Sequence, residues 1–471
     1  MKKLFLTLVF CSLAFAKLQD LTLQEALDLL AKNNDQIKIA KLEERMAAFD
    51  EKIAQSYNYG SLDLIFNALR SNDAGNVFGF KLQSREAKFI DFGFDQFLAP
   101  MGQVLEAMNA NPGGLPQGFT QQMGSILDIQ PQKLNYPKAR NHFQTKVQYK
   151  LPIYTGMKLT MYKKITNAMK KMKHLDYKKM RNEMVYQTKK TFYDITLVEN
   201  YIKNLELIKN NMDRLENIIK NFKAEGYAKD TDVLEVQAKK AEVESYLNQA
   251  RLNRALAYQY LSFLIDEEVE SIHHVAEIAP LPSEPTAKLV DRTIDMQKVR
   301  LGQKITSFNV RLKKSGFYPM VGAFGEYGSA DDELWNRFLD KDAYTVGAQL
   351  KWNLFEGGKT NAEVQKAKIQ KIKMQEQYNL AKRGLALKIN QIKTAVKSKD
   401  FDIKAQSKQY ELAKKIYQMY EEKYKEGIER ISNVLIKQSE EIQVLLRLLK
   451  TKTERNEKVF ELERLLDKEN K

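Results

Sequence analysis

Two segments of the chain alternate between apolar and polar residues with a period of two. They span residues 142–151 and 344–354, and Trp352 lies near the end of the second apolar face. One apolar face with aromatic ends and one polar face are typical of a transmembrane β-strand. A half-buried strand of a soluble sheet is the alternative interpretation. Weaker strand patterns lie near residues 57–68 and 317–328.

Each alternating segment leads into a very long segment with a helical pattern. Residues 159–225 contain neither Gly nor Pro, and residues 359–426 contain only Gly384. Either helix would be ~100 Å long at about 1.5 Å per residue. Gly226 and Gly427 are predicted to end these helices as C-cap residues. We expect coiled-coil-like packing by two apolar stripes: Leu205, Ile208, Met212, Leu215, Ile218 and Ile219, and Leu412, Ile416, Met419 and Tyr420.

The chain repeats itself at an offset of 201 positions. Residues 148–156 (QYKLPIYTG) correspond to residues 349–357 (QLKWNLFEG), and the glycine after each long helix lies at the same offset, at Gly226 and Gly427. The offset stays constant up to the helices that return from these glycines. Thr231 with its neighbouring aspartates is predicted to cap the first returning helix, and Ser432 with Asn433 the second. A duplicated unit with such constant spacing predicts two equivalent structural repeats.

The first repeat has two further features. Residues 21–56 have a helical pattern, which Thr22 and Glu25 open as a capping box. Residues 57–140 are rich in Gly, Asn, Phe and Gln and contain five prolines. We expect a strand, a long loop with little regular structure, and a lead-in to the next strand.

The N-terminus predicts export from the cytoplasm. Lys2 and Lys3 precede an apolar run, and Ala14-Phe15-Ala16 is a small-x-small cleavage site. The only cysteine, Cys11, follows the bulky Phe10, which disfavours a lipoprotein signal. The mature chain would therefore contain no cysteine, and no later segment is apolar enough for a membrane-spanning helix.

Charge and composition exclude several kinds of chemistry. The net charge is +16, carried by lysine runs such as residues 170–173, but export and the lack of a nucleic-acid motif argue against nucleic acid as a partner. The four histidines have no metal-binding spacing, and no nucleophile motif or phosphate loop is present. We therefore expect no enzyme, no cofactor and no metal site.

Four strands cannot close a barrel, and lipid tolerates no open sheet edge. If these segments enter a membrane, several chains must contribute strands to one barrel. Eight strands leave an interior that side chains fill, whereas twelve leave an open lumen. The pattern therefore predicts a subunit of an oligomeric pore, lined by Lys146, Lys150, Gln349 and Lys351.

Over nearly its whole mature length the chain resembles the TolC-type outer-membrane efflux proteins. The matching residues are Leu23-Gln-Glu-Ala-Leu27 with Asn33-Asn34, the turns at 151–156 and 353–358, Tyr318-Pro319 and the two Gly-ended helix tips. The resemblance implies mixed α and β structure. Four strands per chain, twelve in a homotrimer, would form an outer-membrane β-barrel that continues as a long α-helical barrel in the periplasm.

The resemblance also implies function and partners. We expect a passive outer-membrane exit duct of a tripartite efflux or type I secretion system, gated at its periplasmic end. Its partners would be outer-membrane lipid, a periplasmic adaptor and an inner-membrane pump of the RND, ABC or MFS type. The alternative is a periplasmic coiled-coil adaptor or structural spacer without a pore, which would not need strands before each long helix.

The gate residues are transferred by position from the family. Asp232 matches an aspartate six residues after the first tip glycine, and Tyr424 matches its tyrosine partner three residues before the second. Their hydrogen bond would be a closed-state latch. For Asp232 the alternative is a simple helix cap.

Two departures from the family concern the same region. Glu429, with Arg430 beside it, stands where other members have an arginine, and Asn433 and Ile436 replace two aspartates that ring the aperture. An aspartate ring attracts cations, so we expect a weak cation preference here. Adaptor docking is predicted at Gly226, Tyr227, Gly427 and Ile428.

The predicted organisation follows the two repeats. The insertion at residues 60–140 has no counterpart of equal length in the second repeat, and we expect it to project outside the cell, where it would narrow or cover the mouth. The segments are the signal peptide (1–16), a periplasmic helix (17–56), a strand, long extracellular loop and strand (57–156), a helical hairpin (157–279), a connector and helix (280–316), a strand pair (317–358) and a second helical hairpin (359–471).

Overall fold

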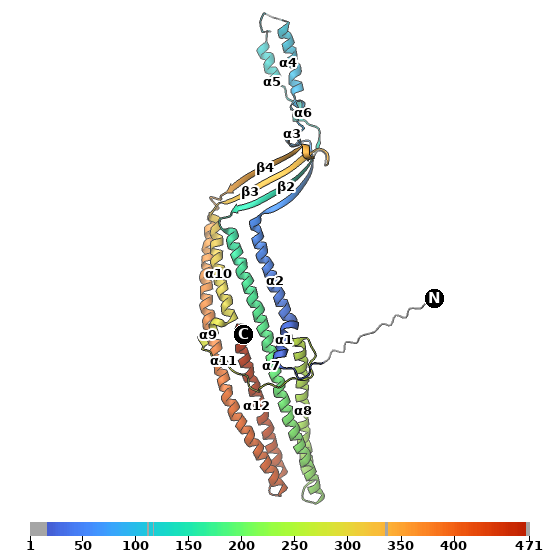
Figure 1. Ribbon diagram of the computed structural model, residues 1–471, viewed down its shortest axis with the longest axis vertical. Helices are drawn as coiled ribbons and strands as arrows, with labels where there is room; N and C mark the ends of the chain where they lie inside the picture. Colours follow the sequence, from blue (N-terminus) through green and yellow to red (C-terminus); the bar gives the residue numbers. More distant parts are fainter. Residues whose placement is uncertain (1–16, 111–112, 116, 335–337, 468–471) are drawn as a thin grey trace, which may run out of the picture. The chain divides into compact units, whose positions relative to one another are not determined.

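The computed structural model describes residues 17–110, 113–115, 117–334 and 338–467 (Figure 1). The predicted signal peptide therefore lies outside the described residues. The chain divides into two compact units. The helical unit comprises the described residues of Met1–Glu51, Ile165–Ser307 and Lys368–Lys471, and the strand unit comprises those of Lys52–Lys164 and Phe308–Ala367.

The strand unit contains one antiparallel sheet of four strands in sequence order. The strands are β1 (Ser61–Ser71), β2 (Arg140–Tyr154), β3 (Met320–Asp331) and β4 (Asp342–Lys351). Short 3-10 turns, η1 (Tyr57–Tyr59) and η3 (Ser315–Phe317), precede β1 and β3. Both strong strand predictions and both weaker ones are confirmed. Each repeat thus contributes two neighbouring strands.

The two faces of this sheet are the reverse of those in a soluble protein. The register aligns Leu64 with Val147 and Val147 with Tyr327, all on the apolar face. Leu64 is 74% exposed and Tyr344 of β4 is 79% exposed, whereas Gln148, on the polar face, is buried. An exposed apolar face opposite a polar one suits contact with lipid.

The insertion between β1 and β2 is more regular than its composition predicts. It contains α3 (Ala74–Gln83), η2 (Phe89–Phe92), α4 (Phe94–Asn109), α5 (Phe119–Leu127) and α6 (Gln132–Asn135). The expectation of a long loop with little regular structure is therefore wrong. Asp73 caps α3 by accepting a hydrogen bond from the Asn76 amide, and α4 accommodates Pro100 in its interior.

The helical unit is built mainly from two long hairpins. The helices are α1 (Leu23–Asn33), α2 (Asp35–Ser56), α7 (Lys158–Ala224), α8 (Asp230–Ile265), α9 (Thr286–Arg292), α10 (Ile294–Lys314), α11 (Lys359–Lys425) and α12 (Ile431–Leu465), some of which extend into the strand unit. Both α7 and α11 have 67 residues. Their first residues, Lys158 and Lys359, lie 201 positions apart, so the predicted duplication is confirmed.

The hairpins share a core near their ends. The predicted α7 stripe is confirmed, because Leu205, Met212 and Leu215 are buried against apolar residues of α8, α11 and α12. The predicted α11 stripe is wrong for a single chain except at Tyr420, which packs against this core. Leu412, Ile416 and Met419 are exposed, whereas Tyr417 and Tyr424 of the same helix enter the core.

The N-terminal helix begins as predicted. The Thr22 hydroxyl accepts a hydrogen bond from the Glu25 amide at 3.3 Å, and a Glu25 carboxylate oxygen accepts one from the Thr22 amide at 2.9 Å. These reciprocal bonds form the capping box of α1.

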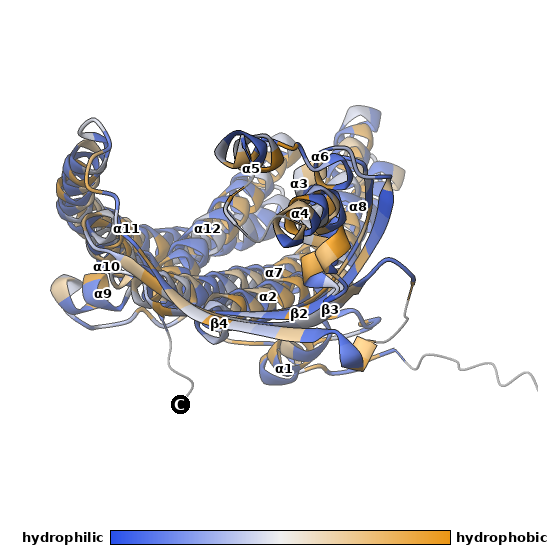
Figure 2. Ribbon diagram, turned by 90° about the horizontal axis from the view of Figure 1, so that it is seen from above, coloured by the Kyte–Doolittle hydropathy of each residue, from blue (hydrophilic) through white to orange (hydrophobic). Residues whose placement is uncertain are grey.

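Polar and apolar residues are mixed along the long helices (Figure 2). Within the part of the chain that the structure describes, no helix is both long and apolar enough to cross a bilayer.

Candidate functional site

The first long hairpin turns at Gly226, which has a φ of +86°. The Tyr227 amide donates to the Phe222 carbonyl at 2.8 Å, and the Gly226 amide donates to the Lys223 carbonyl at 3.0 Å. This pair of hydrogen bonds is a Schellman motif, which requires a left-handed residue at the glycine position.

The second hairpin repeats this geometry at Gly427, which has a φ of +75°. The Ile428 amide donates to the Lys423 carbonyl at 2.9 Å, and the Gly427 amide donates to the Tyr424 carbonyl at 3.0 Å. The residue after each glycine, Tyr227 or Ile428, is exposed. The structure therefore presents an apolar side chain at both tips, where adaptor docking is predicted.

The returning helices begin differently from the prediction. Lys229 is the N-cap of α8, and Arg430 is the N-cap of α12, so neither Thr231 nor Ser432 is the capping residue. In α8 the Asp232 carboxylate accepts a hydrogen bond from the Lys229 amide at 2.9 Å. A carboxylate in the first turn of a helix is also favoured by the helix dipole.

Tyr424 is buried near the tip, with 8% of its surface exposed. Its ring lies 6.1 Å from the ring of Phe222, measured between centroids. Burial, and then the negative charge of Asp232, raise the pKa of Tyr424. The structure thus brings Asp232 and Tyr424 into one region, although among the described residues no hydrogen bond joins their side chains.

The other predicted gate residues lie at the start of α12. The Asn433 side-chain amide donates to the Glu429 carboxylate, and the Arg430 backbone amide donates to it at 3.2 Å. These two bonds, the first being the larger effect, lower the pKa of Glu429. Ile436 is exposed. Asn433 is therefore held by Glu429, whereas Ile436 is open to solvent in the single chain.

A buried polar cluster lies further along the same hairpin, and the sequence analysis missed it. Glu441 is 3% exposed, and the Gln438 side-chain amide donates to its carboxylate at 2.9 Å. Tyr417 is also buried. Within the described part of the chain, the Tyr417 hydroxyl and Gln438 Oε1 have no hydrogen-bond partner. The available signal was two polar residues three positions apart, between the apolar pairs Val434–Leu435 and Ile442–Leu445 of α12.

The polar face of the sheet carries a second feature that the sequence analysis missed. Lys146 Nζ lies 3.0 Å from the Glu326 carboxylate of β3, and the Gln148 side chain also donates to Glu326. Of the lysines that were predicted to line a lumen, Lys146 is therefore neutralised. Glu326 lies on β3, one of the two weaker predicted strands. The sequence did not show that β3 pairs with β2, so it could not predict this ion pair.

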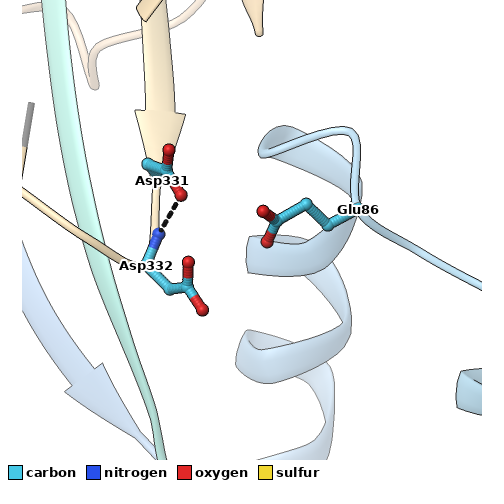
Figure 3. A group of neighbouring side chains, drawn as sticks. All are labelled: Glu86, Asp331 and Asp332. Atoms are coloured by element: carbon cyan, nitrogen blue, oxygen red, sulfur yellow. Dashed lines mark hydrogen bonds between the residues drawn. The ribbon is translucent and has the colours of Figure 1, made fainter. Parts of the chain in front are cut away.

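Three carboxylates gather where β3 ends and the insertion begins (Figure 3). Oxygens of Glu86, Asp331 and Asp332 lie within 4.8 Å of one another. Two cations already lie among them. Lys341 Nζ is 2.7 Å from Asp331 Oδ1 and also pairs with Glu86, while Arg140 pairs with Glu86 and lies 3.2 Å from Asp332. The arrangement is an ion-pair network in which two cations bridge the three carboxylates.

The fold is that of solved outer-membrane channels. One structure of CusC, from work on transmembrane channel formation, has a TM-score of 0.73 at 11% identity and covers 93% of this chain and 90% of its own. The Campylobacter jejuni CmeC outer membrane channel has a TM-score of 0.71 at 14% identity, with 94% and 85% covered. The Vibrio cholerae outer membrane protein VceC has a TM-score of 0.71 at 12% identity, with 94% of both chains covered.

Sequence comparison finds a family match over the second repeat. Residues 287–467, which include α9 to α12 and the strands of the second repeat, match the model of the outer membrane efflux protein family. The second repeat is therefore similar to the outer membrane efflux proteins. No protein with a curated description matches it.

Two comparisons therefore agree: the chain has the fold of solved outer-membrane channels, and its second repeat matches an outer membrane efflux model. The predicted fold class is therefore confirmed, and the predicted family is matched over residues 287–467.

Proposed function

We propose that three copies of this chain assemble into a gated exit duct. In each chain, β1 and β4 are the two edges of the sheet, and among the described strands each pairs on one side only. An unpaired edge exposes backbone amides and carbonyls, which lipid cannot satisfy. Twelve strands from three chains would close the sheet and leave an open lumen.

The main support for this proposal is a sheet with two unpaired edges and an exposed apolar face. Its apolar face is exposed and its polar face holds Gln148 and the Lys146–Glu326 pair. A periplasmic spacer without a pore would have no use for such a face, because exposed apolar surface in water favours aggregation.

Exposed apolar stripes on the helices support assembly. Ile39, Leu42 and Met46 of α2 are exposed at spacings of three and four residues, as are Leu412, Ile416 and Met419 of α11. This spacing is that of side chains that pack between neighbouring helices. We infer that these stripes are buried between copies.

The hairpin tips are the proposed periplasmic gate. Tyr424 is buried next to the α7 tip, and Asp232 is near enough to raise its pKa. In the proposed closed state the Tyr424 hydroxyl donates to Asp232, and Glu429, Arg430 and Asn433 hold the start of α12. Ile436 replaces a charge at the aperture, so we expect weak cation block.

The proposed partners act at the same tips. Tyr227 and Ile428, which the two Schellman motifs present to solvent, would contact a periplasmic adaptor. An inner-membrane pump would supply the exported substrate, by efflux or by type I secretion. Selection of the substrate would then occur at the pump.

Oligomeric state in the outer membrane tests the assembly. Outer-membrane extracts run on gels with and without heating are expected to show a heat-sensitive trimer that becomes monomer on boiling. A monomer that osmotic shock releases from the periplasm would overturn the proposal.

A further inference from the structure

Helix α4 of the insertion has an apolar stripe that the hairpin itself does not cover. Leu98 is 57% exposed and Leu105 is 53% exposed, whereas Val104, about a quarter-turn around the helix from Leu105, is buried. The stripe has alternating spacings of four and three residues, as in helices that pack on other helices. Its residues are Phe94, Leu98, Met101, Leu105 and Met108.

The charges of the insertion indicate what kind of partner covers this stripe. Residues 89–132 contain no Lys, Arg or His, in a chain with 76 Lys and Arg. A surface that binds the phosphates of a lipid headgroup needs such cations. The segment is therefore unsuited to anionic lipid.

Two of the four acids of this segment, Asp91 and Asp95, are paired with lysines of the insertion. Asp91 pairs with Lys81 of α3 at 2.5 Å, and Asp95 pairs with Lys133 of α6 at 2.6 Å. Glu106 is the only other acid on α4. A weakly charged apolar stripe can meet an identical stripe with little like-charge repulsion.

The insertion is anchored firmly to the ends of the strands. The Phe80 ring of α3 stacks on His142 of β2 with centroids 4.1 Å apart. Glu86 joins both Arg140 and Lys341, and the Arg140 guanidinium also donates to the Ser84 hydroxyl at 3.0 Å. These contacts hold the base of the insertion at β2 and β4.

The position of the insertion in the sheet favours another copy of this chain as the partner. The insertion follows β1, one of the two edges that must pair with a neighbouring copy. When three sheets close into one barrel, the strand ends that carry the insertion gather at one rim, which brings the α4 stripes of the copies near one another. The insertion joins the C-terminal end of β1 to the N-terminal end of β2, whereas the other ends of these strands are connected along the chain to η1 and α7.

We propose that the α4 helices of the assembled copies pack against one another through this stripe and form a helical cap over the outer mouth. The inference rests on the trimer of the proposed function. It adds a second constriction, which is separate from the gate at the hairpin tips.

Cysteine cross-linking tests the cap. Cys11 is the only cysteine and lies in the predicted signal peptide, so Leu98→Cys or Leu105→Cys introduces the only thiol of the mature chain. Mild oxidation of outer-membrane preparations is expected to give covalent dimers, because disulfides need Cα atoms within about 7 Å. Gln103→Cys, on the opposite side of α4, is the matched control and should remain monomeric on a denaturing gel.

The outcomes separate the cap from the duct. Equal cross-linking of Leu98→Cys and Gln103→Cys, or none at Leu98 and Leu105 in an intact trimer, would overturn the cap and leave the duct standing. In the second case a lipid or another protein would cover the stripe. Absence of the trimer itself would instead contradict the proposed function.

Channel conductance provides a second readout. Leu98→Asp combined with Leu105→Asp places like charges in the proposed contact and should enlarge the single-channel conductance of the trimer, whereas Gln103→Asp should not. An unchanged conductance in the double variant would contradict a cap that narrows the mouth. Both leucines are exposed in the single chain, so the fold itself should tolerate the changes.

Discussion

At the scale of single residues, Glu441 is a buried acid whose environment opposes its charge. Burial is the main cause that raises its pKa, and hydrogen bonding to Gln438 lowers it only in part. The unfolded chain loses this proton at lower pH than the folded chain does, so the folded state binds more protons. The stability therefore falls as the pH rises from about 4.5 through the pKa of the folded state.

Glu441→Gln should remove this effect. The variant is expected to be more stable than the wild type at pH 7, by about 1–3 kcal/mol, the range for a poorly satisfied buried group. The gain should shrink towards pH 4.5. Thermal unfolding at the two pH values measures it. Glu440→Gln, at an exposed neighbour, is the control, and an equal gain there would contradict the explanation.

Single residues also show where sequence interpretation succeeds and fails. Gly226 and Gly427 could be predicted, because a left-handed helix end selects glycine whatever the surroundings are. The sequence could not predict that Tyr417, rather than Leu412, is the core residue of α11. Packing within a chain and packing between chains require the same helical spacing, so the pattern alone cannot separate the two kinds of surface.

At the scale of elements, the hairpin tips depend on their glycines. Gly427→Ala should destabilise the second hairpin by about 1–2 kcal/mol, the cost of a left-handed conformation for an L-residue. Gly384→Ala is the opposite case, since Gly384 lies inside α11 and an added Cβ would have no neighbour within 4 Å. That variant should gain about 0.5–1 kcal/mol. Thermal unfolding measures the change in stability of both variants. If both changes had the same sign, the left-handed conformation of Gly427 or the helical position of Gly384 would be contradicted.

The ion-pair network should hold the base of the insertion. Burial favours the protonated form of Glu86, but hydrogen bonds from Lys341 and Arg140 outweigh it and lower the pKa of this carboxylate. Glu86→Gln removes the charge from between two cations, so the insertion should become more sensitive to chymotrypsin. The exposed Glu106→Gln is the control. Equal cleavage rates for the two variants would show that the network does not anchor the insertion.

The helices of the insertion could not be predicted because local and tertiary signals disagree there. Glycine and proline are frequent in residues 93–131, and Pro100 lies inside α4. Such residues favour loops when they are considered alone. The apolar residues of α4 nevertheless recur at helical spacing, and the partner helix α5 and the paired acids stabilise the result.

At the scale of the whole molecule, the duplication made the fold predictable. Two copies of one pattern give two pairs of strands and two long hairpins, and the constant offset of 201 positions fixes equal lengths for α7 and α11. The ion pairs between elements could not be predicted. They join residues far apart in the sequence, such as Glu86 and Lys341, whose separation depends on the finished sheet.

Weak cation block also belongs to this scale, because it depends on how the copies meet. Asn433 and Ile436 bring no negative charge to the proposed aperture, so divalent or trivalent cations added on the periplasmic side should change the conductance little. Ile436→Asp should introduce a block that rises with cation concentration. A strong block in the wild type would place other acids at the constriction.

The most direct test of the account is the single-channel conductance of the purified full-length protein in a planar bilayer. The account predicts small, regular steps for the wild type, and larger steps when Asp232→Ala and Tyr424→Phe are combined. Asp230→Ala, an exposed acid at the same tip that pairs with Lys223, should leave the steps unchanged. Equal steps in all three proteins would keep the pore but remove the latch, whereas a well-folded trimer that conducts no current would contradict the exit duct itself.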